Sequence, residues 1–117
     1  MEVVGKYVEK FNQLTGQSLE CGDVFQSEGL CVHIEKRHPD CVAEIPNIPL
    51  ILASPDYIGR NPKEKNSVEL VKRMGDNLMV CVKLDLKSNY FFVATLFKIS
   101  DAKLKNRIAS GRLKKYN

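Results

Sequence analysis

The hydrophobic positions of the chain follow a helical period in its first part and an alternating period in its second. Apolar residues recur at steps of three and four over residues 3–14, which predicts an amphipathic helix that ends at Gly16. A second helix is predicted from Ser27, a residue type favoured as an N-cap, to His38, because Pro39 disfavours helical geometry at the residue before it.

Short elements are predicted around and beyond these two helices. Residues 23–26 are expected to form an extended link. The segment 40–62 holds four of the five prolines and predicts one or two short helical turns. Asn47 is placed to cap one of them, and Ser-Pro-Asp at 54–56 is typical of another helix start, because proline is favoured in the first turn. Glycine, asparagine and proline occur together at 59–62, which predicts a turn.

The second half of the chain changes to a period of two. Strict alternation predicts a strand over residues 78–86, followed by a hairpin-sized break at 87–89. Residues 90–99 are rich in aromatic and β-branched side chains and are apolar on both faces, which predicts a strand in the interior of its sheet. Residues 67–74 fit a strand and a helix alike, and we favour the strand. A basic helix is predicted over 100–111, with a serine cap at its start.

Helices followed by a hairpin-based antiparallel sheet are typical of an α+β fold. A chain of 117 residues has the size of one domain, so we expect residues 1–117 to share a single core. The helices are expected to cover one face of the sheet and to leave the other face for a partner.

Charge is distributed unevenly along the chain. The net charge is +4, but residues 1–58 carry four basic and nine acidic side chains, a net of −5, whereas residues 59–117 carry fourteen basic and five acidic side chains, a net of +9. The basic half suits a polyanionic partner such as RNA, because each phosphate contact needs a cation. A solvated lysine-rich face shows the same pattern, so charge alone does not decide between them.

The cysteines and the hydropathy profile indicate the compartment. No apolar run reaches the ~20 residues of a membrane helix, and the first eleven residues mix charged and apolar side chains, unlike a signal peptide. The spacing of Cys21, Cys31, Cys41 and Cys81 matches no zinc motif, and we expect these residues to be buried free thiols. We therefore expect a chain that makes no use of a membrane and acts in the reducing cytosol.

The strongest chemical feature is a pair of histidines in the segment VHIEKRHP. Imidazole titrates near pH ~6.5 and can therefore give and take protons at neutral pH. Cleavage of RNA by its own 2′-hydroxyl needs a base, an acid and cations for the phosphorane charge. This segment supplies all three types in His33, Lys36, Arg37 and His38. The alternatives are a solvated His33 and a His38 that only caps the end of its helix.

Metal and cofactor chemistry fits the sequence less well. Two imidazoles five residues apart on a helix do not converge on one ion, and no acidic cluster lies nearby. Neither a glycine-rich phosphate loop nor a Gly-x-Ser-x-Gly motif occurs. We therefore expect neither a metal nor a cofactor.

The motifs follow one another in an informative order. HIEKRHP is followed by a block containing IPLIL and PDYI, a lysine-rich loop, LMVCVKLDLK and YFFVATLFKIS. In this order the chain resembles the phage-associated barnase/EndoU/colicin/RelE-like nuclease domains over residues 25–113. The most specific parts of the resemblance are HIxxRHP, PDYI and VATLFKI.

This resemblance implies helices packed on an antiparallel sheet of about four strands, and a metal-independent ribonuclease that often acts on tRNA. It makes His33 and His38 the acid/base candidates. Thr95 lies where related domains place a hydroxyl on a central strand, able to orient the phosphate. A threonine with no other role than its β-propensity is the alternative.

The resemblance also implies candidates for substrate binding, each with a simpler alternative. Lys83 and Lys98, on adjacent strands, are candidates to stabilise phosphate charge, or are plain surface lysines. Tyr57 is a candidate to stack on a splayed base, or a core residue. Arg60 and Asn61 are candidates for phosphate contacts, and turn chemistry explains Asn61 equally well. The substrate-binding candidates are Lys36, Arg37, Tyr57, Arg60, Lys83 and Lys98.

Two functional hypotheses follow. The first is a toxin or effector that cuts single-stranded RNA, tRNA in particular, by acid/base transesterification and leaves a 2′,3′-cyclic phosphate. Such an enzyme implies an immunity protein, for which an acidic surface against the basic half would be effective. The second is a non-catalytic RNA-binding or phage-associated module that uses the same basic face, with the aromatic residues of 90–97 as a stacking platform or as core.

Overall fold

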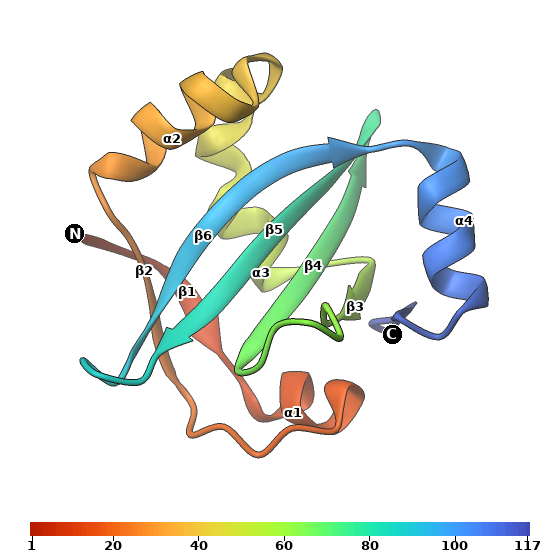
Figure 1. Cartoon of the computed structure of the whole chain (residues 1–117), viewed down its shortest axis with the longest axis horizontal. Helices are drawn as coiled ribbons and strands as arrows, with labels where there is room; N and C mark the ends of the chain where they lie inside the picture. Colours follow the sequence, from red (N-terminus) through yellow and green to blue (C-terminus); the bar gives the residue numbers. More distant parts are fainter.

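The computed structural model describes the whole chain, Met1–Asn117, as an α+β fold built on one seven-stranded mixed sheet (Figure 1). The strands are β1 (Glu2–Tyr7), β2 (Gly22–Gln26), β3 (Tyr57–Gly59), β4 (Ser67–Met74), β5 (Asp76–Asp85), β6 (Tyr90–Ile99) and β7 (Leu113–Lys115). The helices are α1 (Glu9–Thr15), α2 (Gly29–Arg37), the 3-10 helix η1 (Pro39–Asn47), α3 (Ile48–Ala53) and α4 (Asp101–Ala109).

The sheet is larger than the sequence predicts. Its strand order is β1-β2-β6-β5-β4-β3-β7, and the one parallel pair joins β2 to β6. The α+β class is confirmed, but the expected antiparallel sheet of about four strands, with N-terminal helices packed on it, is wrong, because the sheet is mixed and its strands alternate with the helices. Three strands of three to six residues, β1, β3 and β7, complete the sheet at its two edges. Strands this short carry too few positions for an alternating pattern to be visible.

The N-terminal segment corrects the single helix expected over residues 3–14. Its first part is β1, and only its second part, α1, is helical. Val3 pairs with Phe25 and Gly5 pairs with Val24, so that Val4 is the extra residue of a β-bulge. The bulge turns Val4 and Tyr7, three residues apart, to the same buried face. A bulged strand therefore reproduces the spacing of a helix.

The proline-rich segment forms the expected short helical turns, η1 and α3, but no helix starts at residues 54–56. The Asp56 N–H donates to the carbonyl of Val71 (2.8 Å), and its carboxylate accepts from the Arg73 N–H (2.8 Å). Asp56 thus binds the neighbouring strand β4 and leads the chain into β3. The predicted helix start is wrong because these contacts come from a distant part of the chain.

The second half agrees closely with its prediction. β4 and β5 are strands, β6 lies between β2 and β5 in the sheet interior, and α4 begins after a serine cap. The hydroxyl of Ser100 accepts from the Lys103 N–H (3.1 Å). Of the aromatic residues of β6, Phe91 is core and the others are half-buried. Strand β7, which follows α4, was not predicted.

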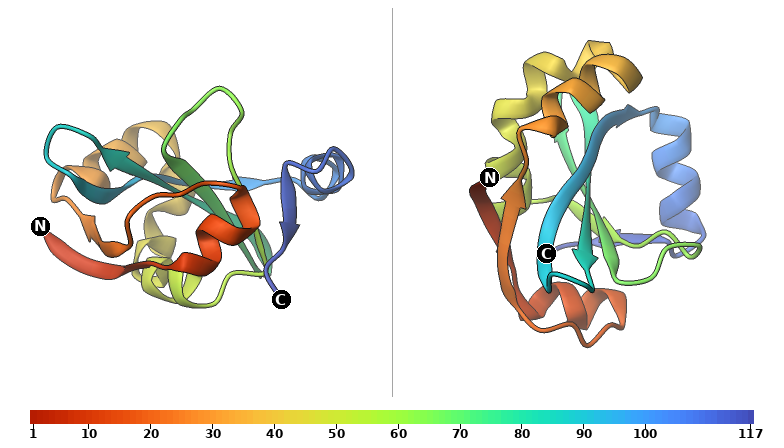
Figure 2. Two further views of the ribbon diagram at one scale, coloured as in Figure 1. Left: turned by 90° about the horizontal axis from the view of Figure 1, so that it is seen from below. Right: turned by 60° about the vertical axis from the view of Figure 1, so that its left-hand side comes forward.

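Helices cover both faces of the sheet, but unequally. Side chains of α1, α2, η1 and α3 pack with β4, β5 and β6 in the main core, whereas α4 packs through Leu104 on part of the opposite face. The left-hand view of Figure 2 shows the loop of residues 60–66 on the other side of the sheet from α1 and α3. That loop and α4 leave a section of this second face uncovered. None of the helices has the length and hydropathy needed to cross a bilayer.

The cysteines differ from the expectation in their burial. All four are free thiols, but only Cys41 is buried, and Cys81 is half-buried. Cys21 and Cys31 are exposed. Cys21 lies in the connection just before β2 and Cys31 on the outer side of α2, where no neighbouring element covers them.

Candidate nucleotide-binding cleft

The uncovered face of the sheet is hollowed into a cleft of about 600 Å³, which we call the histidine cleft. Helix α2 lies along one side of this face and helix α4 along the other (Figure 1). Its titratable lining residues are His33, Arg37, His38, Glu64, Glu69, Cys81, Lys83, Arg107 and Arg112. Both histidines of the chain therefore line one cleft.

His33 reaches the cleft because of the way in which α2 follows β2. Strand β2 pairs with β6 only at Phe91 and Phe92, so the rest of that edge of β6 is free of a neighbouring strand. Helix α2 packs along this free edge. Its His33 Nε2 lies 3.1 Å from Thr95 Oγ1 on β6, within hydrogen-bonding distance. The hydroxyl predicted on a central strand thus contacts one of the two predicted imidazoles.

His38 is the C-cap residue of α2, where its backbone N–H donates to the carbonyl of Ile34 (2.8 Å). Its ring stacks on Phe97, with ring centres 5.2 Å apart and 27° between the planes. The ring centres of His33 and His38 lie 6.3 Å apart. Both side chains are half-buried, so each imidazole is held by packing and still faces the cleft. Arg37, which has no acidic partner, lies beside them.

A row of side chains crosses the floor of the cleft. Thr95, Cys81 and Glu69 lie directly opposite one another on β6, β5 and β4, and so share one face of the sheet. Two strand spacings, about 10 Å, separate the two ends of the row. Burial, and to a lesser degree the nearby carboxylate of Glu69, raises the pKa of Cys81 to about 12. This thiol therefore stays protonated at neutral pH.

The far end of the row carries a buried carboxylate held by two arginines. Arg112 donates from Nε and Nη2 to the two oxygens of Glu69, at 2.8 and 2.7 Å. Arg107 Nη1 lies 4.0 Å from the same carboxylate. Glu69 is only 4% exposed, and its hydrogen bonds raise the pKa of Arg112 further above its ordinary value. A fork of this kind fixes the guanidinium in place and leaves Nη1 free to bind an anion.

A fourth cation, Lys83, lies in the cleft between these two ends. Lys83 Nζ is 2.7 Å from Glu64, which belongs to the loop of residues 60–66. Both side chains are about 40% exposed, so water screens the ion pair. A phosphate that enters the cleft can therefore displace Glu64 at little cost.

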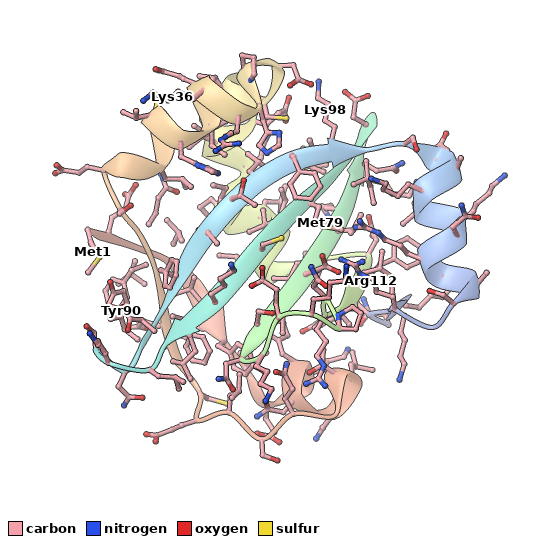
Figure 3. The ribbon with its side chains drawn as sticks, in the orientation of Figure 1. Met1, Lys36, Met79, Tyr90, Lys98 and Arg112 are labelled. Atoms are coloured by element: carbon pink, nitrogen blue, oxygen red, sulfur yellow. The ribbon has the colours of Figure 1, made fainter.

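Four of the predicted substrate-binding residues lie outside the histidine cleft. Lys36 points outward from α2, and Lys98 forms ion pairs with Asp40 (3.8 Å) and Asp76 (3.2 Å) near the end of β6 (Figure 3). Tyr57 packs beside the small core under α4. Arg60 lines a different hollow, on the other side of the sheet edge. The structure thus brings together His33, Arg37, His38, Lys83 and Thr95.

Sequence reasoning missed Glu69, Arg107 and Arg112. A signal for Glu69 is present: it lies between Val68 and Leu70 in a strand, so the pattern places its carboxylate on the face opposite the main core. No signal in the sequence connects it with Arg112, which lies 43 residues further on. Figure 3 shows Arg112 beside β4 on the open face.

The histidine cleft contains two imidazoles, three arginines and Lys83, whose ion pair with Glu64 an incoming phosphate can replace. Imidazoles transfer protons near neutral pH, and guanidinium groups stabilise phosphate charge. Nowhere are three or more histidine, cysteine, aspartate or glutamate side chains grouped so as to hold a metal ion.

Comparison with known proteins gives one family. Residues 1–106, about nine-tenths of the chain, match the family described as phage-Barnase-EndoU-ColicinE5/D-RelE like nuclease3. The match extends over every element that lines the histidine cleft except the last residues of α4 and the approach to β7. No curated protein and no solved structure matches the chain.

Proposed function

Since the chain belongs to the phage-Barnase-EndoU-ColicinE5/D-RelE like nuclease family, we propose that it is a metal-independent ribonuclease that cuts single-stranded RNA in the histidine cleft. One observation carries this proposal. His33 and His38, with ring centres 6.3 Å apart, face the cleft beside Thr95 and Arg37. Each proton-transfer group must come within about 3 Å of the oxygen it serves, and two rings this close can both reach one phosphodiester.

The reaction we propose is transesterification. One imidazole takes the proton of the ribose 2′-hydroxyl as its oxygen forms a bond to phosphorus. The bond from phosphorus to the 5′-oxygen of the next nucleotide breaks, and the other imidazole gives that oxygen its proton. The products are a 2′,3′-cyclic phosphate and a free 5′-hydroxyl. Thr95 positions His33 through the 3.1 Å contact and so fixes the direction in which its other nitrogen points.

The cations of the cleft stabilise the phosphorane. Arg37 has no acidic partner and lies next to the two histidines, so its guanidinium can bind the non-bridging phosphate oxygens. Lys83 joins it when the phosphate replaces Glu64. Arg112 is fixed by Glu69 at the other end of the cleft, where its free Nη1 can bind a neighbouring phosphate of the strand.

Single-stranded RNA is the proposed substrate because an open cleft admits a strand whose bases are unstacked. Loops of tRNA present such strands, and we propose tRNA in the cytosol as the target of a toxin or effector. An inhibitor that presents carboxylates to Arg37 and Lys83 would block the cleft, and this is the surface we assign to an immunity protein. These last two assignments rest on the charge of the cleft and on the family.

The test is cleavage of total tRNA by the purified protein in the presence of EDTA. We expect discrete fragments that end in a 2′,3′-cyclic phosphate, because the proposed chemistry uses no divalent ion. His33→Ala and His38→Ala should each lower the rate at least about hundredfold, since removal of an acid or base typically has this effect. Lys87→Ala, in the turn before β6, is the control and should keep the wild-type rate.

The outcomes separate the proposal from its competitor. Cleavage that EDTA abolishes contradicts the metal-independent mechanism, and full activity in both histidine variants contradicts the assigned site. Tight binding of RNA that remains intact favours the non-catalytic RNA-binding module. Circular dichroism of each variant shows that it is folded.

A further inference from the structure

A second hollow lies around the sheet edge from the histidine cleft, between the end of α1 and the turn from α4 to β7. It has a volume of about 640 Å³, and we call it the arginine hollow. Among its nine lining residues, three are cationic and none is acidic. The cationic residues are Arg60, Arg112 and Lys114. The hollow therefore offers a purely positive surface.

Two of the three cations of this hollow, Arg60 and Lys114, have no acidic partner, whereas Arg112 is bound to Glu69. Lys83 and Lys98 are ion-paired. Neither Arg60 nor Lys114 lies within 4.0 Å of an acidic oxygen, and the side chain of neither forms a hydrogen bond within the chain. Cations left free at a concave surface, and not needed to hold the fold, are available to a ligand.

Arg112 belongs to both hollows. Its Nε and Nη2 bind Glu69 on the side of the histidine cleft, while the residue also lines the arginine hollow. The loop of residues 60–66 is shared in the same way: Asn61 and Glu64 line the first, and Arg60 and Pro62 the second. The two hollows thus meet at Arg112, on either side of one loop.

The backbone fixes this arrangement. Gly59 pairs with Leu113 in the β3–β7 ladder, so Arg60 and Arg112 follow as the next opposed positions. A Cβ on Gly59 would lie 1.8 Å from the carbonyl oxygen of Arg112, so only glycine permits this approach. The two arginines are therefore held close together before any ligand binds.

We propose that the arginine hollow binds the sugar-phosphate backbone of the RNA strand away from the bond that is cut. This inference rests on the proposed ribonuclease function and adds an extended substrate to it. Thr95 and Glu69 mark the ends of a row about 10 Å long, and the hollow lies beyond Glu69. One phosphate cannot contact both the histidines and Arg60, but a strand with a phosphate at every nucleotide can.

The test compares short and long substrates in the double variant Arg60→Ala/Lys114→Ala. We expect its kcat/KM for an RNA decamer to fall about tenfold or more, mainly through KM, because two charge-assisted contacts are lost. Its kcat/KM for a dinucleotide should stay at the wild-type value, since a dinucleotide does not reach the hollow. Lys6→Ala/Lys87→Ala removes the same charge elsewhere on the surface and is the matched control.

Binding is measured separately with a fluorescent decamer of 2′-O-methyl RNA, which cannot be cut. The plot of log Kd against log salt should become shallower by about 1.4 in the Arg60→Ala/Lys114→Ala variant, at about 0.7 for each single-strand phosphate contact. Loss of binding in this variant alone supports the inference even if the wild type cuts no RNA. The inference is overturned, whether or not RNA is cut, if both double variants weaken binding equally or if neither weakens it.

Discussion

At the scale of single residues, the site depends on a contact between distant parts of the chain. His33 and Thr95 are 62 residues apart in the sequence and 3.1 Å apart in space. A hydroxyl can donate to or accept from a ring nitrogen, so this contact restrains the ring orientation of the histidine in either tautomer. We therefore propose that Thr95 positions His33, a role whose effect on catalysis can be measured separately from its effect on stability.

The substitution Thr95→Val tests this role. Valine keeps the shape and the strand propensity of threonine but cannot hydrogen-bond, so we expect the fold to be unchanged. The kcat for RNA cleavage should fall about tenfold to hundredfold with little change in KM, because His33 loses its orientation. Thr95→Ser restores the hydroxyl and should recover most of kcat. Equal losses in Thr95→Val and Thr95→Ser would assign the effect to packing.

A second prediction concerns Tyr7, whose ring stacks on Phe91 with centres 4.3 Å apart and whose hydroxyl donates to Asn12 (2.7 Å). Burial raises the pKa of Tyr7 from 10.0 to about 12. The unfolded chain releases this proton at lower pH than the folded chain. The stabilisation by the neutral phenol is therefore complete below pH 10 and lost as pH rises through about 12.

We expect the free energy of unfolding of the wild type to fall between pH 10 and pH 12 more steeply than that of Tyr7→Phe. Urea unfolding followed by circular dichroism at three pH values in this range measures both slopes. Phenylalanine can keep the stacking on Phe91 and has no proton to lose. The other groups that titrate in this range are the same in both proteins, so the difference between the two slopes reports Tyr7 alone. Parallel slopes would show that the pKa of Tyr7 is the same in the folded and the unfolded chain, and would contradict the prediction.

At the scale of elements, the sequence was most informative where one strand carries many alternating positions. Strands β5 and β6 and helix α4 were predicted because each has its own pattern of burial or its own cap. Strands β1, β3 and β7 were missed since each depends on its neighbours: β1 on a bulge against β2, and β3 and β7 on each other. The pairing of Glu69 with Arg112 was missed for the same reason.

The β3–β7 ladder gives a prediction at this scale. Gly59→Ala places a methyl group against the backbone of Arg112 and must separate the two strands. We expect a loss of about 3 kcal/mol in the free energy of unfolding, as for other overpacked sites. Gly22→Ala, where a methyl group meets nothing within 4 Å, is the control and should change stability by no more than about 0.5 kcal/mol. A similar stability for both variants would contradict the assigned ladder.

At the scale of the whole molecule, the unequal distribution of charge along the sequence becomes a distribution in space. The basic second half supplies Lys83, Arg107 and Arg112 to the cleft and Lys114 to the hollow beside it, whereas α2 supplies both histidines and Arg37. The histidine pair was predicted from the sequence because it is local. The second half carries fourteen cations. The fold decides which of them lie near the histidine pair, and no local sequence pattern indicates this.

The contact between α2 and β6 also has a consequence for the order of events during synthesis. A ribosome makes His33 long before it makes Thr95, and it makes Glu69 long before Arg112. A growing chain that ends before β6 has its imidazoles without the surface that orients them. The cleft is therefore completed only when the last third of the chain has left the ribosome and its strands have packed against the first third.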